Sequence, residues 1–365
     1  MFKIRNRCPV LTAEMVTDGH PDKFCDQVAD AILDCALESD SKSRVAIECL
    51  AKDNLLIISG ELTTEAKINV EQEARKVWQK IGYGDSQALV VINFIKEQSF
   101  DIAKGKEKGG VDFGGAGDQG VMVGFATDET PEMLPLEYVH ARRICERLKR
   151  LRESNKLSWL KPDGKSQVTM QDGAVTNIVI AAQHDSEIDI EQVRFELKRH
   201  VVEPLFGRVK NLVINGTGAF TVGGTFADAG VVGRKIVVDA YGPRVPVGGG
   251  AYSGKDPSKV DRSAAYMARH IAKSIVANRI ADARKCLVSL AFGIGQRQPE
   301  MVTAITEEGR DLSSWVKAHF PDLSPEGISE YLGLRQPKGW TYFETASFGH
   351  YGRDHFPWEQ VSPKR

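Results

Sequence analysis

The chain has 365 residues, of which 42% are hydrophobic and 27% are charged, and its 48 Lys and Arg residues nearly balance 49 Asp and Glu residues. A net charge of −1 excludes a protein that coats nucleic acid through excess positive charge, so we expect no nucleic-acid partner. The six cysteines form no C-x-x-C pair, and no segment is apolar enough for a signal peptide or a membrane span, so we expect a cytoplasmic protein that does not contact a membrane.

Three helix-like segments begin with a proline, a residue suited to the first turn of a helix. They start at Pro21, Pro135 and Pro257, which lie 114 and 122 residues apart. After each helix the same order of elements recurs: two strand-like runs, a second helix and a final strand-like run. The second helices are expected over 70–82, 190–202 and 311–320, and the final strands over 88–95, 211–222 and 339–348.

This recurrence predicts an α+β fold of three repeats related by a pseudo-threefold axis. Each repeat is expected to have a mixed or antiparallel sheet with helices on one face. The linear limits are 1–104, 115–222 and 224–361, with 105–114 as a mobile loop or linker, although the true domains are expected to be discontinuous. The alternative is that any α+β protein shows such alternation by chance.

The stretch GGGAYSGKD, which begins at Gly248, raises the question of a nucleotide P-loop. Counting from Gly249, it fits the first seven positions, but the Ser or Thr expected at the eighth is Asp256. A strand is predicted over 236–242, but two prolines separate it from the glycines, whereas a P-loop follows its strand directly. We therefore reject the P-loop.

The same stretch can still bind phosphate. Consecutive glycines expose backbone N–H groups, and a helix is expected to begin at Pro257. Lys255 and Lys259 add positive charge, and Asp261 is a hard oxygen ligand suited to Mg²⁺. The alternative is a solvated glycine loop with surface lysines.

GHPDK, residues 19–23, places three chemically active side chains at the start of the first helix. His20 can donate to a phosphate oxygen, Asp22 can bind Mg²⁺, and Lys23 can neutralise charge. Taken alone, Asp22 is equally well explained as a carboxylate favoured by the helix dipole.

Further charged residues stand in or beside glycine-containing segments. GAGDQG contains Asp118, PDGKSQV contains Asp163 and Lys165, and GRK contains Arg234 and Lys235. For Asp163 the alternative is a plain β-turn. Interleaved carboxylates and cations are what a polyphosphate with Mg²⁺ requires.

GHPDK, SGELTT, GAGDQG, DGKSQV and GGGAYSGKDPSKVDRSAAY, in this order and spacing, resemble the S-adenosylmethionine synthetase (methionine adenosyltransferase) family. The resemblance runs from about Leu11 to Trp358. It implies that methionine sulfur attacks C5′ of ATP and displaces triphosphate, which is then hydrolysed to diphosphate and phosphate. It also implies a homodimer, often paired into a tetramer, with active sites shared at the subunit interface.

The resemblance assigns roles to residues of this chain. The catalytic and triphosphate-binding residues would be His20, Lys165, Arg234, Lys235 and Lys255. Asp163, Phe220 and Ala251 would contact ATP on the nucleoside side, and Asp228 would be a further ATP contact. Methionine would contact Glu61, Gln98, Asp118, Asp228 and Lys259. Asp22 and Asp261 would bind two Mg²⁺ ions per site, Glu48 would bind one K⁺, and residues 98–114 would form a lid.

Ala219, Val247 and Phe292 depart from the family's usual residues, so the resemblance says least about the adenine side and the methionine pocket. Two other functions stay open. A kinase or ATPase using the Gly-Lys loop would release ADP, and a catalytically silent homologue would act as a partner subunit.

Overall fold

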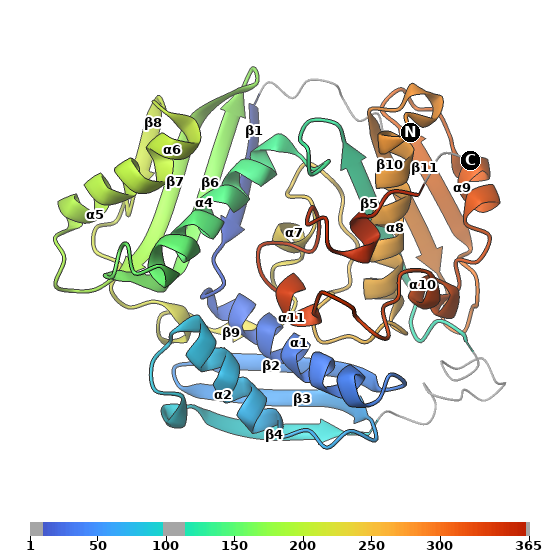
Figure 1. The fold of residues 1–365 in the computed structure, drawn as a ribbon, viewed down its shortest axis with the longest axis horizontal. Helices are drawn as coiled ribbons and strands as arrows, with labels where there is room; N and C mark the ends of the chain where they lie inside the picture. The colour runs from blue at the N-terminus through green and yellow to red at the C-terminus, as the bar shows by residue number, and fades with distance from the viewer. Residues whose placement is uncertain (1–9, 98–113, 363–365) are drawn as a thin grey trace.

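The computed structural model describes residues 10–97 and 114–362, which form three sheets with helices packed on them (Figure 1). This confirms the predicted α+β class. The N-terminal sheet has the order β4 (Val90–Lys96), β3 (Leu55–Thr63), β2 (Arg44–Lys52), β9 (Gly230–Val231). The central sheet has the order β1 (Val10–Val16), β6 (Leu160–Gln171), β7 (Ala174–His184), β8 (Asn211–Ile214). The C-terminal sheet has the order β11 (Met301–Thr306), β10 (Lys285–Phe292), β5 (Gly120–Thr127).

Each sheet is covered by a long helix followed by a shorter one. The N-terminal sheet carries α1 (Pro21–Ser39) and α2 (Val70–Ile81), the central sheet carries α4 (Leu136–Glu153) and α5 (Ile190–Leu197), and the C-terminal sheet carries α8 (Val260–Ala277) and α9 (Ser313–His319). α5 continues through a π-helical turn into α6 (Glu203–Phe206), and α10 (Pro325–Tyr331) packs on α8. In the part of the chain that the structure describes, no helix combines the length and the apolar character needed to cross a bilayer.

The three sheets are interlocked by an exchange of strands. β1, β5 and β9 each precede a long helix in the chain, but each pairs in the sheet beneath a different long helix. β1 pairs antiparallel with β6, β5 with β10, and β9 with β2. Every sheet therefore contains a strand from another part of the chain. The linear domain limits remain a prediction.

Two predicted strands are wrong. Residues 236–242 contain a one-turn helix, α7 (Ile236–Asp239), and residues 339–348 contain another, α11 (Tyr342–Thr345). At α11 the reason is a capping box: the Thr341 hydroxyl accepts from the Glu344 N–H, and the Glu344 carboxylate accepts from the Thr341 N–H. The predicted strand over 211–222 ends at Ile214, because Asn215 adopts a positive φ of 45°.

At Gly124 the backbone of β5 lies directly against the backbone of α8. A Cβ added at Gly124 would lie 2.0 Å from the carbonyl carbon of Ala268. This close approach sets the height of α8 above its sheet. It thereby fixes the start of α8, which carries Asp261.

Candidate active site

The N-terminus of α1 gathers the first group of predicted site residues. His20 is the N-cap, and its Nδ1 accepts from the Asp22 N–H at 3.1 Å. The Asp22 carboxylate accepts from Lys235 Nζ at 2.5 Å and from the Val231 N–H at 2.9 Å. Burial and the charges of Lys235 and Lys165 lower the pKa of His20 to about 3, so the imidazole is neutral at physiological pH. Burial alone would raise the pKa of Asp22, but the hydrogen bonds from Lys235 and Val231 lower it.

α1 presents four aspartates spaced one turn apart, here called the aspartate stripe: Asp22, Asp26, Asp30 and Asp34. Each accepts backbone N–H groups from a distant segment. The donors are Val231 to Asp22, Gly233 to Asp26, Gly254 to Asp30, and both Tyr342 and Phe343 to Asp34. The stripe therefore holds parts of residues 230–254, with the glycine loop, along one side of α1.

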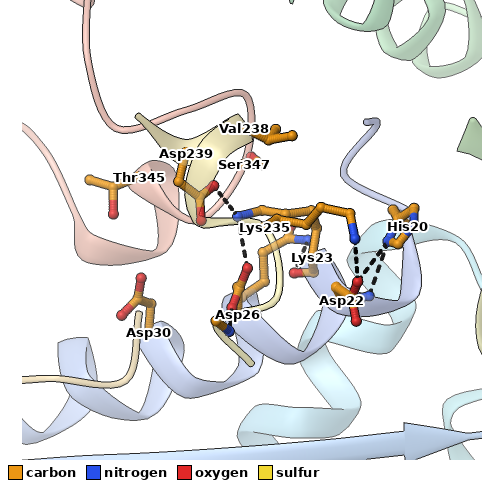
Figure 2. A network of polar contacts seen from close by, with 12 residues as sticks. His20, Asp22, Lys23, Asp26, Asp30, Lys235, Val238, Asp239, Thr345 and Ser347 are labelled. Carbon is orange, nitrogen blue, oxygen red and sulfur yellow. Dashed lines mark hydrogen bonds and ion pairs between the residues drawn. The ribbon is translucent and has the colours of Figure 1, made fainter. Parts of the chain in front are cut away.

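Lys23 does not serve the role that the motif suggested. Its side chain is 1% exposed, and Nζ lies 2.8 Å from Asp26 Oδ2 and 2.6 Å from Asp239 Oδ1 (Figure 2). Burial alone would lower the pKa of Lys23, but the two carboxylates raise it, so the lysine is charged. A phosphate cannot reach this ammonium group.

The glycine loop and the start of α8 form the second group. Lys255 Nζ lies 2.6 Å from Asp261 Oδ2. A Cβ added at Gly250 would lie 2.1 Å from Asp261 Cγ, so the loop backbone is packed directly against this carboxylate. A Cβ added at Gly233 would likewise lie 2.5 Å from the Ala251 Cβ, so the two groups adjoin where Gly233 faces the Ala251 side chain.

Asp256, at the position where a P-loop has its hydroxyl, is a buried structural residue. Its carboxylate accepts from Lys259 Nζ at 2.6 Å and from the Val45 N–H at 2.7 Å, and Arg335 lies 3.3 Å away. Burial alone would raise the pKa of Asp256, but Lys259 and Arg335 hold it well below its usual value. The rejection of a P-loop is consistent with this geometry, and Lys259 is paired with Asp256.

The predicted nucleoside residues lie beside the first group. Asp163 is buried and its Oδ2 accepts from the Gly224 N–H at 2.8 Å. Burial raises the pKa of Asp163, while the Gly224 N–H lowers it. A Cβ added at Gly19 would lie 2.4 Å from the Pro162 Cβ, so the start of α1 touches the strand that carries Asp163 and Lys165. The Phe220 N–H donates to His184 Nε2 at 3.0 Å.

The remaining predicted residues that the structure describes are exposed or lie on the open face of a sheet, and of these Lys165 lies close enough to His20 to lower the pKa of the imidazole. Lys165, Arg234, Asp118 and Asp228 are exposed in the single chain. Glu48 and Glu61 lie on β2 and β3 and point to the face of the sheet opposite α1 and α2. Gln98 and nearly all of the predicted lid lie outside the described residues. The single chain thus assembles two adjoining groups and leaves the methionine residues dispersed.

Tyr83 is a site-adjacent residue that the sequence analysis did not identify. Its hydroxyl donates to the Gly19 carbonyl at 2.7 Å. A Cβ added at Gly224 would lie 2.7 Å from the Tyr83 ring. Tyr83 therefore contacts both Gly19, which precedes His20, and Gly224, whose N–H donates to Asp163. A lone tyrosine after a helix C-cap glycine carries no sequence signal for this role.

The carboxylates of the site are suited to bind a metal ion one at a time, and they do not form a cluster of ligands around one ion. Within residues 10–97 and 114–362, no group of three or more His, Cys, Asp or Glu residues is arranged around a common point. Asp22 and Asp261 instead each hold a lysine ammonium group at 2.5 and 2.6 Å. Carboxylate oxygens are the ligands that Mg²⁺ prefers, and the ion usually shares them with substrate phosphates. The two residues therefore suit Mg²⁺ that arrives with a polyphosphate.

The fold and the site define a class of protein: a three-repeat α+β protein in which lysines pair with aspartates at the starts of two long helices. Models of the N-terminal, central and C-terminal domains of S-adenosylmethionine synthetase match residues 9–100, 114–220 and 222–360. An S-adenosylmethionine synthase from Sorangium cellulosum (strain So ce56) is 42% identical over 373 residues, covering 96% of this chain and 87% of the relative. The solved structure of an unusual S-adenosylmethionine synthetase from Campylobacter jejuni is 31% identical, with a TM-score of 0.88 over 97% of both chains.

The chain belongs to the S-adenosylmethionine synthetase family. Its activity is that of a methionine adenosyltransferase, which forms S-adenosylmethionine from ATP and methionine.

Proposed function

We propose that the two groups bind the triphosphate of ATP, with His20, Lys165, Arg234, Lys235 and Lys255 as its ligands. The observation that carries this proposal is the pairing of Lys235 with Asp22 and of Lys255 with Asp261. A polyphosphate with Mg²⁺ offers each partner a replacement, because the lysines can turn to phosphate oxygens while the carboxylates turn to the metal. These two ion pairs would therefore mark the positions of the phosphates and the metal.

The chemistry needs charge stabilisation rather than a base. A thioether sulfur has no proton to lose, so the barrier lies in aligning it with C5′ and in stabilising the charge that develops on the triphosphate. Nδ1 of His20 accepts from the Asp22 N–H, so the proton of the neutral imidazole is on Nε2. We infer that Nε2–H donates to the departing triphosphate.

Asp22 and Asp261 would hold two Mg²⁺ ions per site, and Glu48 would hold one K⁺. When bound, these ions supply positive charge that neutralises the triphosphate. Because Gly250 leaves no room beside Asp261, the carboxylate is held by backbone contact and cannot swing toward the loop.

Methionine would bind Glu61, Gln98, Asp118, Asp228 and Lys259, and Asp228 would also contact ATP. The nucleoside would lie against Asp163, Phe220 and Ala251. The proximity of Asp163 to Asp228, whose charge helps to raise the pKa of Asp163 after the larger effect of burial, supports one pocket for both substrates.

We propose that the active site is completed in a homodimer through the open face of the N-terminal sheet. On this face Leu50, Ile57 and Ile92 form one cross-strand row, and the next row contains Glu48 and Phe94. Leu50, Ile92 and Phe94 are 43%, 37% and 63% exposed. Exposed apolar patches of this kind mark protein interfaces. Burying this face would bring Glu48 and Glu61 to the interface, where the resemblance places shared sites.

Pairing of two dimers into a tetramer, the domain limits given above and a lid over 98–114 complete the proposal. The five cysteines of the described chain are free thiols, which supports a reducing cytoplasm.

The test is incubation of the purified protein with ATP, methionine, Mg²⁺ and K⁺. We expect S-adenosylmethionine with phosphate and diphosphate, and no ADP. Release of ADP would instead support a kinase or ATPase, and the absence of any product would support a silent partner subunit.

A further inference from the structure

Lys23 joins the two ends of the segment that carries Arg234 and Lys235. At the first end, Asp26 accepts the Gly233 N–H at 2.9 Å and also lies 2.8 Å from Lys23 Nζ. At the other end, Asp239 closes α7 and lies 2.6 Å from the same Nζ (Figure 2). A single ammonium group therefore ties residue 233 to residue 239.

This network lies beneath the site and out of reach of any ligand. The side chains of Lys23, Asp26 and Asp239 are 1%, 0% and 3% exposed. α7 is held further by the Tyr138 hydroxyl, which donates to the Val238 carbonyl at 2.8 Å. Above the network, Lys235 reaches Asp22 at 2.5 Å, and Asp22 is adjacent to Lys23 in α1.

We propose that Lys23, Asp26 and Asp239 are positioning residues that form an ionic clamp, which fixes Arg234 and Lys235 in the geometry needed to bind the triphosphate. This inference rests on the triphosphate role proposed for Lys235. A long, flexible lysine gains catalytic value only when its backbone is held, since small misplacements in an active site can cost about 10²-fold in rate. In this proposal the buried ion pairs specify the geometry of the segment, whereas an apolar contact would permit it to slide.

The principal variant is Asp239→Asn, which keeps the side-chain shape and leaves Lys23 paired with Asp26. We expect kcat to fall roughly 10- to 100-fold, together with weaker binding of inorganic tripolyphosphate measured by calorimetry in the presence of Mg²⁺. Asp26→Asn removes the charge that faces Lys23 at the other end of the segment and should give the same pattern. Lys23→Met is less suitable, because it leaves two buried carboxylates without a counter-charge.

Asp34→Asn is the matched control. Asp34 belongs to the same stripe on the same helix and also accepts backbone N–H groups, but its donors are Tyr342 and Phe343. We expect this variant to be less stable yet to keep its kcat and its affinity for tripolyphosphate.

A double variant tests whether the clamp acts through Lys235. If it does, Asp239→Asn should reduce kcat little further in the Lys235→Met background. Effects that multiply in the double variant would show that the clamp does not act through Lys235, and the same result in an Arg234→Met background would overturn the clamp. An Asp239→Asn protein that resembles Asp34→Asn in every measurement would also overturn it. A fully active Lys235→Met protein would instead overturn the triphosphate role of Lys235 and the clamp with it.

Discussion

Lys255 Nζ and Asp261 Oδ2 lie 2.6 Å apart, so the predicted phosphate ligand and the predicted Mg²⁺ ligand form an ion pair with each other. Both side chains are partly accessible, at 21% and 15%, so an arriving phosphate and its metal can separate them. In the proposed site, binding of Mg·ATP would therefore be an exchange of ion pairs.

Replacing Lys255 with Met should reduce the rate of S-adenosylmethionine formation by roughly 10²-fold or more, because a cation that stabilises the leaving group is lost. The fold should be retained, since Asp261 stays partly solvated. Product formation measured by chromatography and circular dichroism check the two parts. Lys76→Met, which removes a surface lysine paired with Glu73 at 2.7 Å, is the control. Full activity of Lys255→Met would remove the proposed triphosphate role.

Gly250→Ala should displace the Asp261 carboxylate, because the added Cβ would lie 2.1 Å from its Cγ. We expect a higher Mg²⁺ concentration for half-maximal activity and only a small change in thermal midpoint, since an aspartate side chain can rotate away. Gly249→Ala is the adjacent comparison, because a Cβ there meets nothing within 4 Å, and it should lose far less. Equal Mg²⁺ requirements in the two variants would contradict the proposed metal role of Asp261.

His270 predicts an acid-dependent loss of stability. It is buried on α8 against Tyr331 and Ser362, and burial lowers its pKa to about 4 from the ordinary 6.5. The unfolded chain therefore binds the proton first, so the stabilisation is complete above pH 6.5 and is lost as the pH falls toward 4. The loss should reach roughly 3 kcal/mol of unfolding free energy at about 1.4 kcal/mol per pKa unit.

Urea unfolding between pH 4 and 8 measures this effect. His270→Gln should flatten the acid limb, whereas Tyr331→Phe removes a partner but keeps the imidazole and should keep the slope. An unchanged slope in His270→Gln would show that other groups cause the acid sensitivity.

Phe94→Asp should dissociate the proposed homodimer and reduce activity, because it places a charge on the open face of the N-terminal sheet. Phe195→Asp is the control, since Phe195 is 59% exposed on α5 against 63% for Phe94. Light scattering coupled to gel filtration reports the mass of each variant. A Phe94→Asp protein with the wild-type mass would place the interface elsewhere.

Much of the fold could be predicted because its signals are local. Short polar turns at Asp53 and Asp172, both with positive φ, join the hairpins where they were expected. The helix at α11 could also have been predicted from the Thr341–Glu344 spacing, which the apolar and aromatic residues around it obscured. The exchange of strands could not, because β1 and β6 pair across some 150 residues and alternation does not specify a partner.

The sequence could predict which residue types make up the candidate site, but not the direction in which each side chain points. The sequence places the motif that contains His20 and Asp22 in a set of interleaved acids and cations, and in the structure Lys235 contacts Asp22. Lys23 belongs to the same motif, yet its side chain points into the interior. The motif could not predict this, because it does not show which side of the helix is covered by the rest of the protein. The spacing of three residues between Lys23 and Asp26 was the available hint.

The exchange of strands also constrains how the polypeptide can be made. β9 pairs with β2, which is synthesised with β3 far earlier than β9. The edge of β2 therefore stays unpaired during synthesis until residues 230–231 have been made. Until then an unpaired edge is exposed to other chains. The three thirds of the protein should therefore unfold as one cooperative unit, and a nick between them should destabilise them all.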